Sequence, residues 1–252
     1  MRLQSFIALV FLLSGCASAP EKSNSTVPIS KEQEAAIVSD LVHGLESKYG
    51  AWKDGVIENS LSVLIIKLSA KNESFRSKPL QRSVRIHLLA TPLPIVSAAP
   101  GGLIFISRGA LKSIQYENEL AFILAAPLAM IRDEIPQKRI EKPSVGWFEP
   151  AGLFDYGFDA YLKADREAVQ MLHEVKFDHR GAISLMKRWN SPEYASQWNS
   201  YWKLTPELIE RYDAVRDEAA KLTPNRDSVL NSKAFDELKL RMKKSDARKN
   251  TR

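Results

Sequence analysis

The stretch from Ala99 to Glu134 constrains the fold of this 252-residue chain more than any other. A Gly-Gly turn at 101–102 precedes a short apolar segment, Leu103 to Ser107, which is typical of a β-strand. A helical turn is expected over 109–114. A longer apolar run then starts at Glu117, and acidic residues in a first turn favour a helix N-terminus. Apolar residues cover every face of this run, which predicts a buried central helix.

The net charge is concentrated at the C-terminal end of the chain. The whole sequence carries 36 basic and 30 acidic residues, a net of +6, whereas residues 226–252 hold nine basic and four acidic residues, a net of +5. The remainder is therefore close to neutral and lacks the excess of basic residues that binds nucleic-acid phosphates. We therefore expect no nucleic-acid partner. The basic segment predicts either a solvated helix face or a contact with anionic lipid.

The N-terminal residues 1–16 have the pattern of a targeting segment. Arg2 precedes an apolar run, Ser5 to Leu13, which is too short to span a bilayer and is typical of a signal peptide. The run ends in Leu-Ser-Gly-Cys, which resembles a bacterial lipobox, so we expect Cys16 to be lipidated at the periplasmic face of the outer membrane. Ordinary cleavage after Ala19 is the alternative. Residues 17–30, rich in Ser and Pro, are expected to be a flexible tether.

Hydrophobic spacing predicts further elements on either side of the central stretch. Ser30 and Gln33 form a capping-box pattern at the start of a helix that should stop at Gly50. The other expected elements are a helix or long strand over 58–68, a loop over 71–81, a half-buried strand over 83–90, a loop or lid over 133–155, and helices over 156–175, 178–189, 205–222 and 227–244.

The central stretch resembles the zinc metallopeptidase family that includes HtpX, BepA and the CaaX prenyl proteases. The matching residues are Gly101, Gly102, Ile104, Phe105, Arg108, Gly109, Glu119, Leu120 and Ala121. The resemblance implies an α+β fold, a mainly helical zincin-like (gluzincin) domain with a small β-sheet, over residues 31–222. Residues 223–252 would then form a separate basic helix and tail.

The resemblance also implies a zinc site, but this chain lacks the ligands. Where the family has its HExxH helix, the sequence has Ala126, Pro127 and Met130 in place of the first histidine, the glutamate and the second histidine. Matching the family's later Glu-Ala-Asp-like motif places Lys163 at the third ligand, and an ammonium group opposes a metal ion. We therefore expect no metal and no catalytic residue. A mid-helix proline also costs about 3 kcal/mol, so we expect Pro127 to kink or break the helix near 123–126.

Other residues do not supply a replacement site. The four histidines, His43, His87, His173 and His179, show no two-ligand spacing, so each is expected to be a surface or hydrogen-bonded residue. Glu167, one turn after Lys163, predicts a salt bridge more than a catalytic pair. Asp165 is expected to pair with one of three arginines, Arg166, Arg180 or Arg211.

The remaining functional candidate is the segment around the Gly-Gly turn. In the family, an edge strand here receives extended substrate by strand addition. We therefore expect a peptide-binding edge formed by Gly101, Gly102, Leu103, Ile104 and Phe105. The prediction is a lipid-anchored, inactive metallopeptidase-like module that binds extended polypeptide or an envelope protein. The alternatives are an active metalloendopeptidase with unrecognised ligands, and a purely structural envelope lipoprotein.

Overall fold

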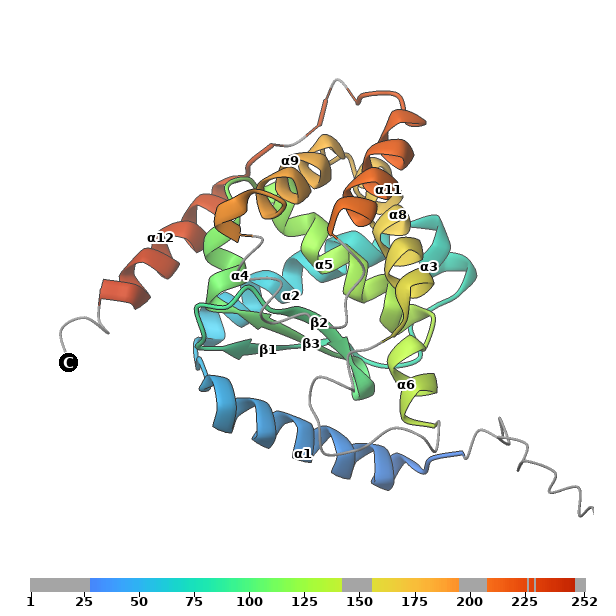
Figure 1. Cartoon of the computed structure of the whole chain (residues 1–252), viewed down its shortest axis with the longest axis vertical. Coiled ribbons are helices and arrows are strands. Elements are labelled where there is room, and N and C mark those ends of the chain that lie inside the picture. The colour runs from blue at the N-terminus through green and yellow to red at the C-terminus, as the bar shows by residue number, and fades with distance from the viewer. Residues whose placement is uncertain (1–27, 142–155, 195–207, 226, 229, 248–252) are drawn as a thin grey trace, which may run out of the picture.

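The computed structural model describes residues 28–141, 156–194, 208–225, 227–228 and 230–247. Over these residues the protein is a mainly helical α+β fold with 11 helices and one three-stranded mixed sheet (Figure 1). The α+β prediction is therefore confirmed. Cys16, the tether up to residue 27, and the segments 142–155 and 195–207 lie outside the described residues, and so does the expected start of the helix over 205–222.

The elements follow one another in this order along the chain. The helices are α1 (Lys31–Tyr49), α2 (Gly55–Ala70), α3 (Glu73–Ser77), η1 (Pro100–Gly102), α4 (Arg108–Ser113), α5 (Glu117–Arg132), α6 (Ile135–Ile140), α8 (Phe158–Glu174), α9 (Arg180–Trp189), α11 (Leu208–Ala220) and α12 (Lys233–Ala247). The strands are β1 (Arg85–Leu89), β2 (Val96–Ala99) and β3 (Leu103–Ser107).

The sheet has the order β1-β3-β2, so β3 is its central strand. β3 runs parallel to β1 and antiparallel to β2, and all five of its residues are buried. A central strand has no free backbone groups for an additional strand. The prediction that Leu103, Ile104 and Phe105 form a binding edge is therefore wrong, and the antiparallel edge of the sheet is β2.

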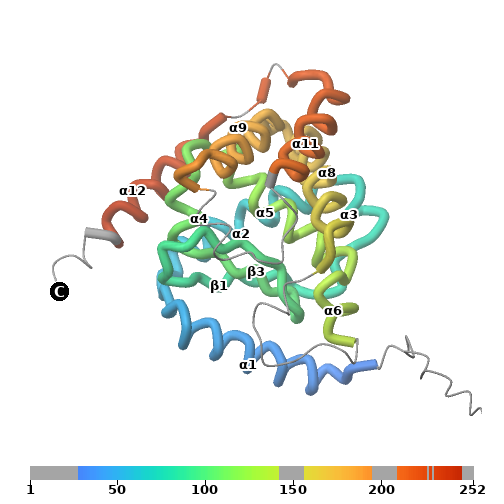
Figure 2. Tube along the Cα trace, in the orientation of Figure 1, coloured from blue at the N-terminus to red at the C-terminus, as the bar shows by residue number. Residues whose placement is uncertain are grey.

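Helices cover both faces of the sheet (Figures 1 and 2). On one face α1 packs Val38, Leu41 and Leu45 in a cluster with Phe105. The main core on the opposite face includes residues of α2, α5, α8, α9 and α11. Alternate residues of β3 therefore enter two separate clusters, because successive side chains of a strand point to opposite faces.

Helix α5 is the centre of the main core. Fifteen of its 16 residues are buried, which confirms the prediction of a buried central helix. It also continues without a break through Pro127 to Arg132, so the predicted break near 123–126 did not occur. The proline still removes one backbone hydrogen bond, at a cost of about 3 kcal/mol. Burial of the helix on all sides offsets that local cost.

Several local predictions are confirmed and two are wrong. Ser30 and Gln33 form a reciprocal capping box, Gly50 ends α1 with φ of 76°, and the ambiguous stretch over 58–68 is helical as part of α2. The expected loop over 71–81 contains α3, which Asn72 caps by accepting a hydrogen bond from the N–H of Ser74. The expected loop over 133–155 begins with α6. Such short helices carry too little periodicity to be recognised from sequence.

The basic C-terminal helix α12 packs on the body of the protein. Phe235, Leu238 and Met242 join the same apolar cluster as α2 and α5. Arg241 of α12 also forms an ion pair of 3.0 Å with Asp54, the residue that caps α2. Among the residues that the structure describes, every helix is too short or too polar to span a bilayer.

Candidate functional site

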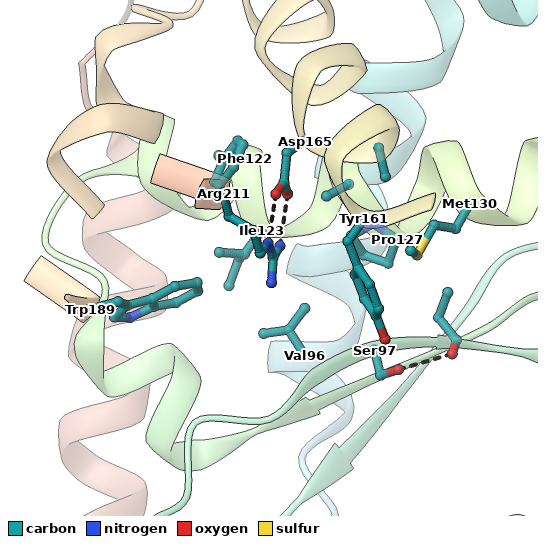
Figure 3. Close-up of a pocket in the computed structure, with 13 residues that line it drawn as sticks. Val96, Ser97, Phe122, Ile123, Pro127, Met130, Tyr161, Asp165, Trp189 and Arg211 are labelled. Carbon is teal, nitrogen blue, oxygen red and sulfur yellow. Dashed lines mark hydrogen bonds and ion pairs between the residues drawn. The ribbon is translucent and has the colours of Figure 1, made fainter. Parts of the chain in front are cut away.

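A mainly apolar pocket lies between the edge strand β2 and helices α5 and α8 (Figure 3). Its walls are Val96, Ser97 and Ala98 of β2; Phe122, Ile123, Ala126, Pro127 and Met130 of α5; Tyr161, Ala164 and Asp165 of α8; Trp189; and Arg211. The pocket encloses about 540 Å³ when its open mouth is counted, but the centre of a water molecule can occupy only about 40 Å³ of it. As it stands it can hold a few waters, so a larger ligand has to widen it.

The structure brings three of the four positions at which the resemblance places the zinc ligands and the glutamate base into this pocket. Ala126, Pro127 and Met130 line it on one side of α5. From α8, however, Tyr161 rather than Lys163 lines the pocket opposite them. Residues two apart on a helix point about 200° away from each other, so both cannot face the same space. Lys163, which the resemblance placed at the third-ligand position, therefore does not line the pocket, whereas Tyr161 does.

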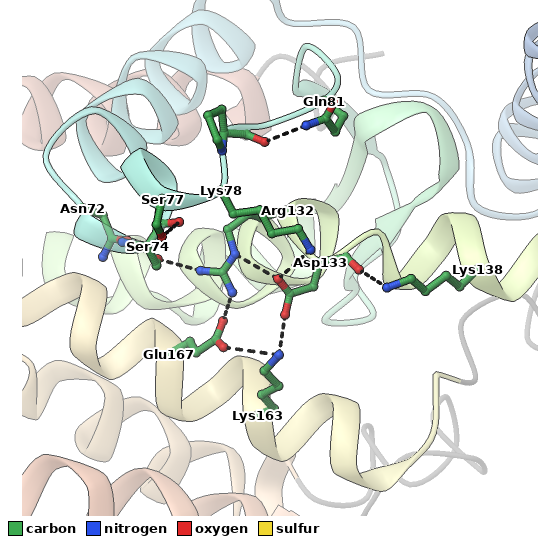
Figure 4. Close-up of polar contacts among 11 residues, drawn as sticks. Asn72, Ser74, Ser77, Lys78, Gln81, Arg132, Asp133, Lys138, Lys163 and Glu167 are labelled. Carbon is green, nitrogen blue, oxygen red and sulfur yellow. Dashed lines mark hydrogen bonds and ion pairs between the residues drawn. The ribbon is translucent and has the colours of Figure 1, made fainter.

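Lys163 belongs instead to a polar network at the C-terminal end of α5 (Figure 4). Its ammonium donates to Asp133 at 2.5 Å and lies 3.7 Å from Glu167, and 60% of its side chain is exposed. The predicted salt bridge of Glu167 is thus confirmed. Burial raises the pKa of Asp133, but hydrogen bonds and charge from Arg132 and Lys163 outweigh it and hold this pKa well below its usual value.

Asp165 forms a buried ion pair with Arg211 at the wall of the pocket. The Arg211 Nε donates to Asp165 Oδ2 at 2.7 Å and its Nη2 donates to Oδ1 at 2.8 Å. The Asp165 side chain is fully buried and that of Arg211 is 13% exposed. Burial would lower the pKa of Arg211, but the charge and hydrogen bonds of Asp165 raise it, so the guanidinium stays charged. Of the three partners expected for Asp165, the structure selects Arg211.

The outer edge of β2 carries backbone groups that point away from the sheet. Ser107 donates its N–H to the Ile95 carbonyl at 2.9 Å, which defines a hydrogen-bonded pair of this antiparallel ladder. Because such pairs alternate, Val96 and Ala98 direct their N–H and C=O groups outward. Tyr156 donates its hydroxyl to the Ala98 carbonyl at 2.7 Å. Burial raises the pKa of Tyr156 well above its usual value, so the hydroxyl remains protonated.

The histidines lie away from the pocket. His43 is exposed on α1 and His87 lies 3.1 Å from Glu46. His173 and His179 come together, with ring centroids 5.4 Å apart, a proximity that their separation of six residues did not predict. Within the described ranges no group of three or more His, Cys, Asp or Glu side chains could hold a metal ion.

The pocket thus contains no arrangement typical of a hydrolytic centre. The one carboxylate among its lining residues, that of Asp165, already accepts two hydrogen bonds from Arg211. The Ser97 hydroxyl donates to the Ala98 carbonyl at 3.1 Å. The geometry fits non-covalent binding of an extended segment along β2. Sequence reasoning missed Tyr156 and Trp189 as neighbours of this site, because both come from elements distant from the central stretch.

Comparison with known proteins adds no family assignment. No protein-family model matches this chain, and no curated protein matches it either.

Proposed function

We propose that this protein is a lipid-anchored, catalytically inactive metallopeptidase-like module that binds extended polypeptide in the bacterial envelope. The proposal includes a zincin-like fold, with the three-stranded sheet and α5 in the places of the family's sheet and metal-binding helix. Cys16 would carry the lipid at the periplasmic face of the outer membrane. Binding, scaffolding and chaperone-like roles share the same physical requirement, a surface that accepts an unfolded segment.

One observation supports the binding role most strongly. The antiparallel edge strand β2 directs backbone groups of Val96 and Ala98 outward, beside an apolar pocket lined by the positions where the resemblance would place metal ligands. A peptide strand that displaces the Tyr156 hydroxyl from the Ala98 carbonyl can pair with these groups and place alternate side chains in the pocket. This moves the proposed binding edge from the Gly101–Phe105 segment to β2.

Photo-crosslinking tests the location of binding. A photoreactive amino acid placed at Val96 should capture an unfolded model polypeptide, whereas the same group at His43, exposed on α1 across the sheet, should capture little. Equal capture at both positions would contradict binding at β2.

For the anchor, Cys16→Ser should release the protein from membranes, and continued membrane association would count against lipidation.

The alternative of an active metalloendopeptidase is tested by metal analysis. Purified protein should contain no stoichiometric zinc and should not cleave unfolded polypeptide. Zinc that a chelator removes together with cleavage activity would establish the enzyme instead. The alternative of a purely structural lipoprotein predicts no capture at Val96, so the crosslinking experiment separates it from the binding module.

A further inference from the structure

A second cleft lies on the opposite face of the sheet, between α1 and the Gly-Gly turn of η1. One side of α1 lines it from Lys31 to Glu46, and Arg82, Arg85 and Gly101 line it from the sheet side. The centres of water molecules can occupy about 640 Å³ of this cleft, compared with about 40 Å³ of the pocket beside β2. The cleft therefore has room for a hydrated polar ligand without any rearrangement.

The Gly-Gly turn brings two arginines close together in this cleft. Glu34 of α1 accepts a hydrogen bond from the Gly101 N–H at 3.0 Å and forms an ion pair with Arg82. Arg85 Nη2 lies 3.7 Å from the point that a Cβ on Gly101 would occupy, and a Val38 methyl lies 3.0 Å from the same point. Glycine suits this position because its φ is 72° and a side chain would press on both neighbours. Both guanidinium groups therefore lie close to Gly101.

The carboxylates of the cleft already have partners. Glu34 is 4% exposed, and its two oxygens accept hydrogen bonds from Arg82 and from Gly101, one each. Glu46, the other carboxylate that lines the cleft, lies 3.1 Å from His87 Nε2. Among the residues that the structure describes, none forms an ion pair with Arg85, and Arg82 uses only its Nη1. The charge that remains unmatched in the cleft is therefore positive.

The pair of arginines indicates which anion fits. A guanidinium group donates two parallel hydrogen bonds to a carboxylate or a phosphate, so one arginine already satisfies both oxygens of a carboxylate. A phosphate group has at least three strong acceptor oxygens and can bind two arginines at once. Two arginines around one glycine, Arg82 and Arg85 at Gly101, therefore favour a phosphate group.

We propose that the cleft between α1 and the Gly-Gly turn binds a phosphate group, with Arg82 and Arg85 donating to its oxygens and Lys31 adding positive charge at the rim. This site lies apart from β2 and does not depend on polypeptide binding there. Soluble phosphate compounds and the headgroups of anionic phospholipids share this chemistry. A lipid on Cys16, 12 residues before residue 28, would keep the start of α1 within about 40 Å of a bilayer.

Titration with inorganic phosphate tests this site on the 252-residue chain carrying Cys16→Ser, which removes the proposed lipid attachment. Nuclear magnetic resonance should show a saturable shift of the Gly101 amide. Arg85→Gln should weaken phosphate binding at least about tenfold. Lys243→Gln, which removes the same charge from an exposed position of α12, should change it less than about twofold. Equal effects of the two variants, or no saturable shift at Gly101, would overturn the proposal.

A charge-neutral double variant separates a formed site from general attraction of anions. Arg82→Gln with Glu34→Gln removes one guanidinium together with the carboxylate that it pairs with, and a glutamine at 34 can still accept from Gly101. Phosphate binding should weaken about tenfold although the charge of the cleft is unchanged. Undiminished binding in this variant, with circular dichroism showing that it is folded, would overturn the two-arginine site. Acetate that binds the unchanged protein as tightly as phosphate would overturn the ligand class.

Two further arms identify the source of the phosphate. One titrates glycerophosphoglycerol, the soluble headgroup of phosphatidylglycerol, and the other sediments the protein with phosphatidylcholine vesicles that contain or lack phosphatidylglycerol. If Arg85→Gln reduces the gain from phosphatidylglycerol more than Lys243→Gln does, the ligand is a lipid headgroup. If phosphate binds in solution but both variants gain equally on vesicles, the ligand is a soluble phosphate compound and the site stands. Crosslinking at Val96 should be the same in Arg85→Gln, so this site and the β2 function stand or fail separately.

Discussion

Two largely buried arginines in this protein each lie beside an aromatic ring and a carboxylate, but they differ in how many of their nitrogens form hydrogen bonds. Arg132 and Arg211 each lie 5.3 Å from the centroid of an aromatic ring, Phe75 and Tyr161 respectively. Arg132 uses all three nitrogens, for Asp133, Ser74 and Glu167. Arg211 uses two, both for Asp165. Arg132 therefore links α5 to α3 and α8, whereas the hydrogen bonds of Arg211 link α11 to α8 alone.

The largest expected effect comes from breaking the pair at the pocket. Arg211→Met leaves the fully buried Asp165 carboxylate without a partner and should lower the free energy of unfolding by about 3–5 kcal/mol, measured by urea denaturation. Adding Asp165→Leu should restore most of the loss, because no charge then remains buried. A double variant as unstable as the single one would show that the pair matters for its shape rather than its charge.

Rebuilding a metal site tests the opposite orientations of Tyr161 and Lys163 on α8. The unbroken helix α5 allows histidines at 126 and 130 to share one face. Ala126→His and Met130→His combined with Tyr161→Glu should therefore bind zinc at least about a hundredfold more tightly, ~2.7 kcal/mol, than the same histidines with Lys163→Glu. Competition with a fluorescent zinc chelator measures the difference. Equal affinities would mean that position 163 reaches the pocket after all.

Acid should weaken the polar network around Asp133. The pKa of Asp133 is held below its usual 3.8, so its contribution to stability is complete above that value and is lost as the pH falls below it. Losing its charge-assisted hydrogen bonds should cost about 1.5–3 kcal/mol in total, of which about 1 kcal/mol is lost between pH 7 and pH 3 and the rest below pH 3. Asp133→Asn should flatten this part of the stability curve, measured by urea denaturation at each pH. If the free energy of unfolding of Asp133→Asn fell with pH as steeply as that of the unchanged protein, the acid sensitivity would come from another group.

The smallest expected effect concerns the one outward carbonyl of β2 that already has a partner. Tyr156→Phe removes one of the two hydroxyl groups that donate to the Ala98 carbonyl, the other being that of Ser97, and so opens this carbonyl further to a bound strand. An acetylated and amidated hexapeptide of alternating valine and threonine with one central phenylalanine should then bind more tightly by about 0.5–1.5 kcal/mol, roughly two- to tenfold. Tyr161→Phe, in the neighbouring helix α8, serves as the control and should not show this gain. Weaker binding in Tyr156→Phe would mean that the hydroxyl contacts the ligand.

Much of the fold was predictable because its signals are local. The capping box at Ser30, the strand from Leu103 to Ser107 and the central helix from Glu117 each depend on residues within a few positions of one another. The partner of Asp165 was predictable only as one of three arginines, since a long-range pair leaves no spacing signal. That positions 126 and 130 carry alanine and methionine instead of a histidine pair was readable directly.

Only the tertiary structure decided the features that carry the proposed function. The strand order places β3 in the centre and β2 at the edge, because β1 pairs in parallel with β3. The sequence does not show on which side of β3 the strand β1 will pair. The rotation of α8 against α5 placed Tyr161 in the pocket and Lys163 outside it. The sequence by itself determined most of the longer elements and the absence of histidine from positions 126 and 130. Which side chains share one space depends on packing between distant elements, and packing is decided by the whole core at once.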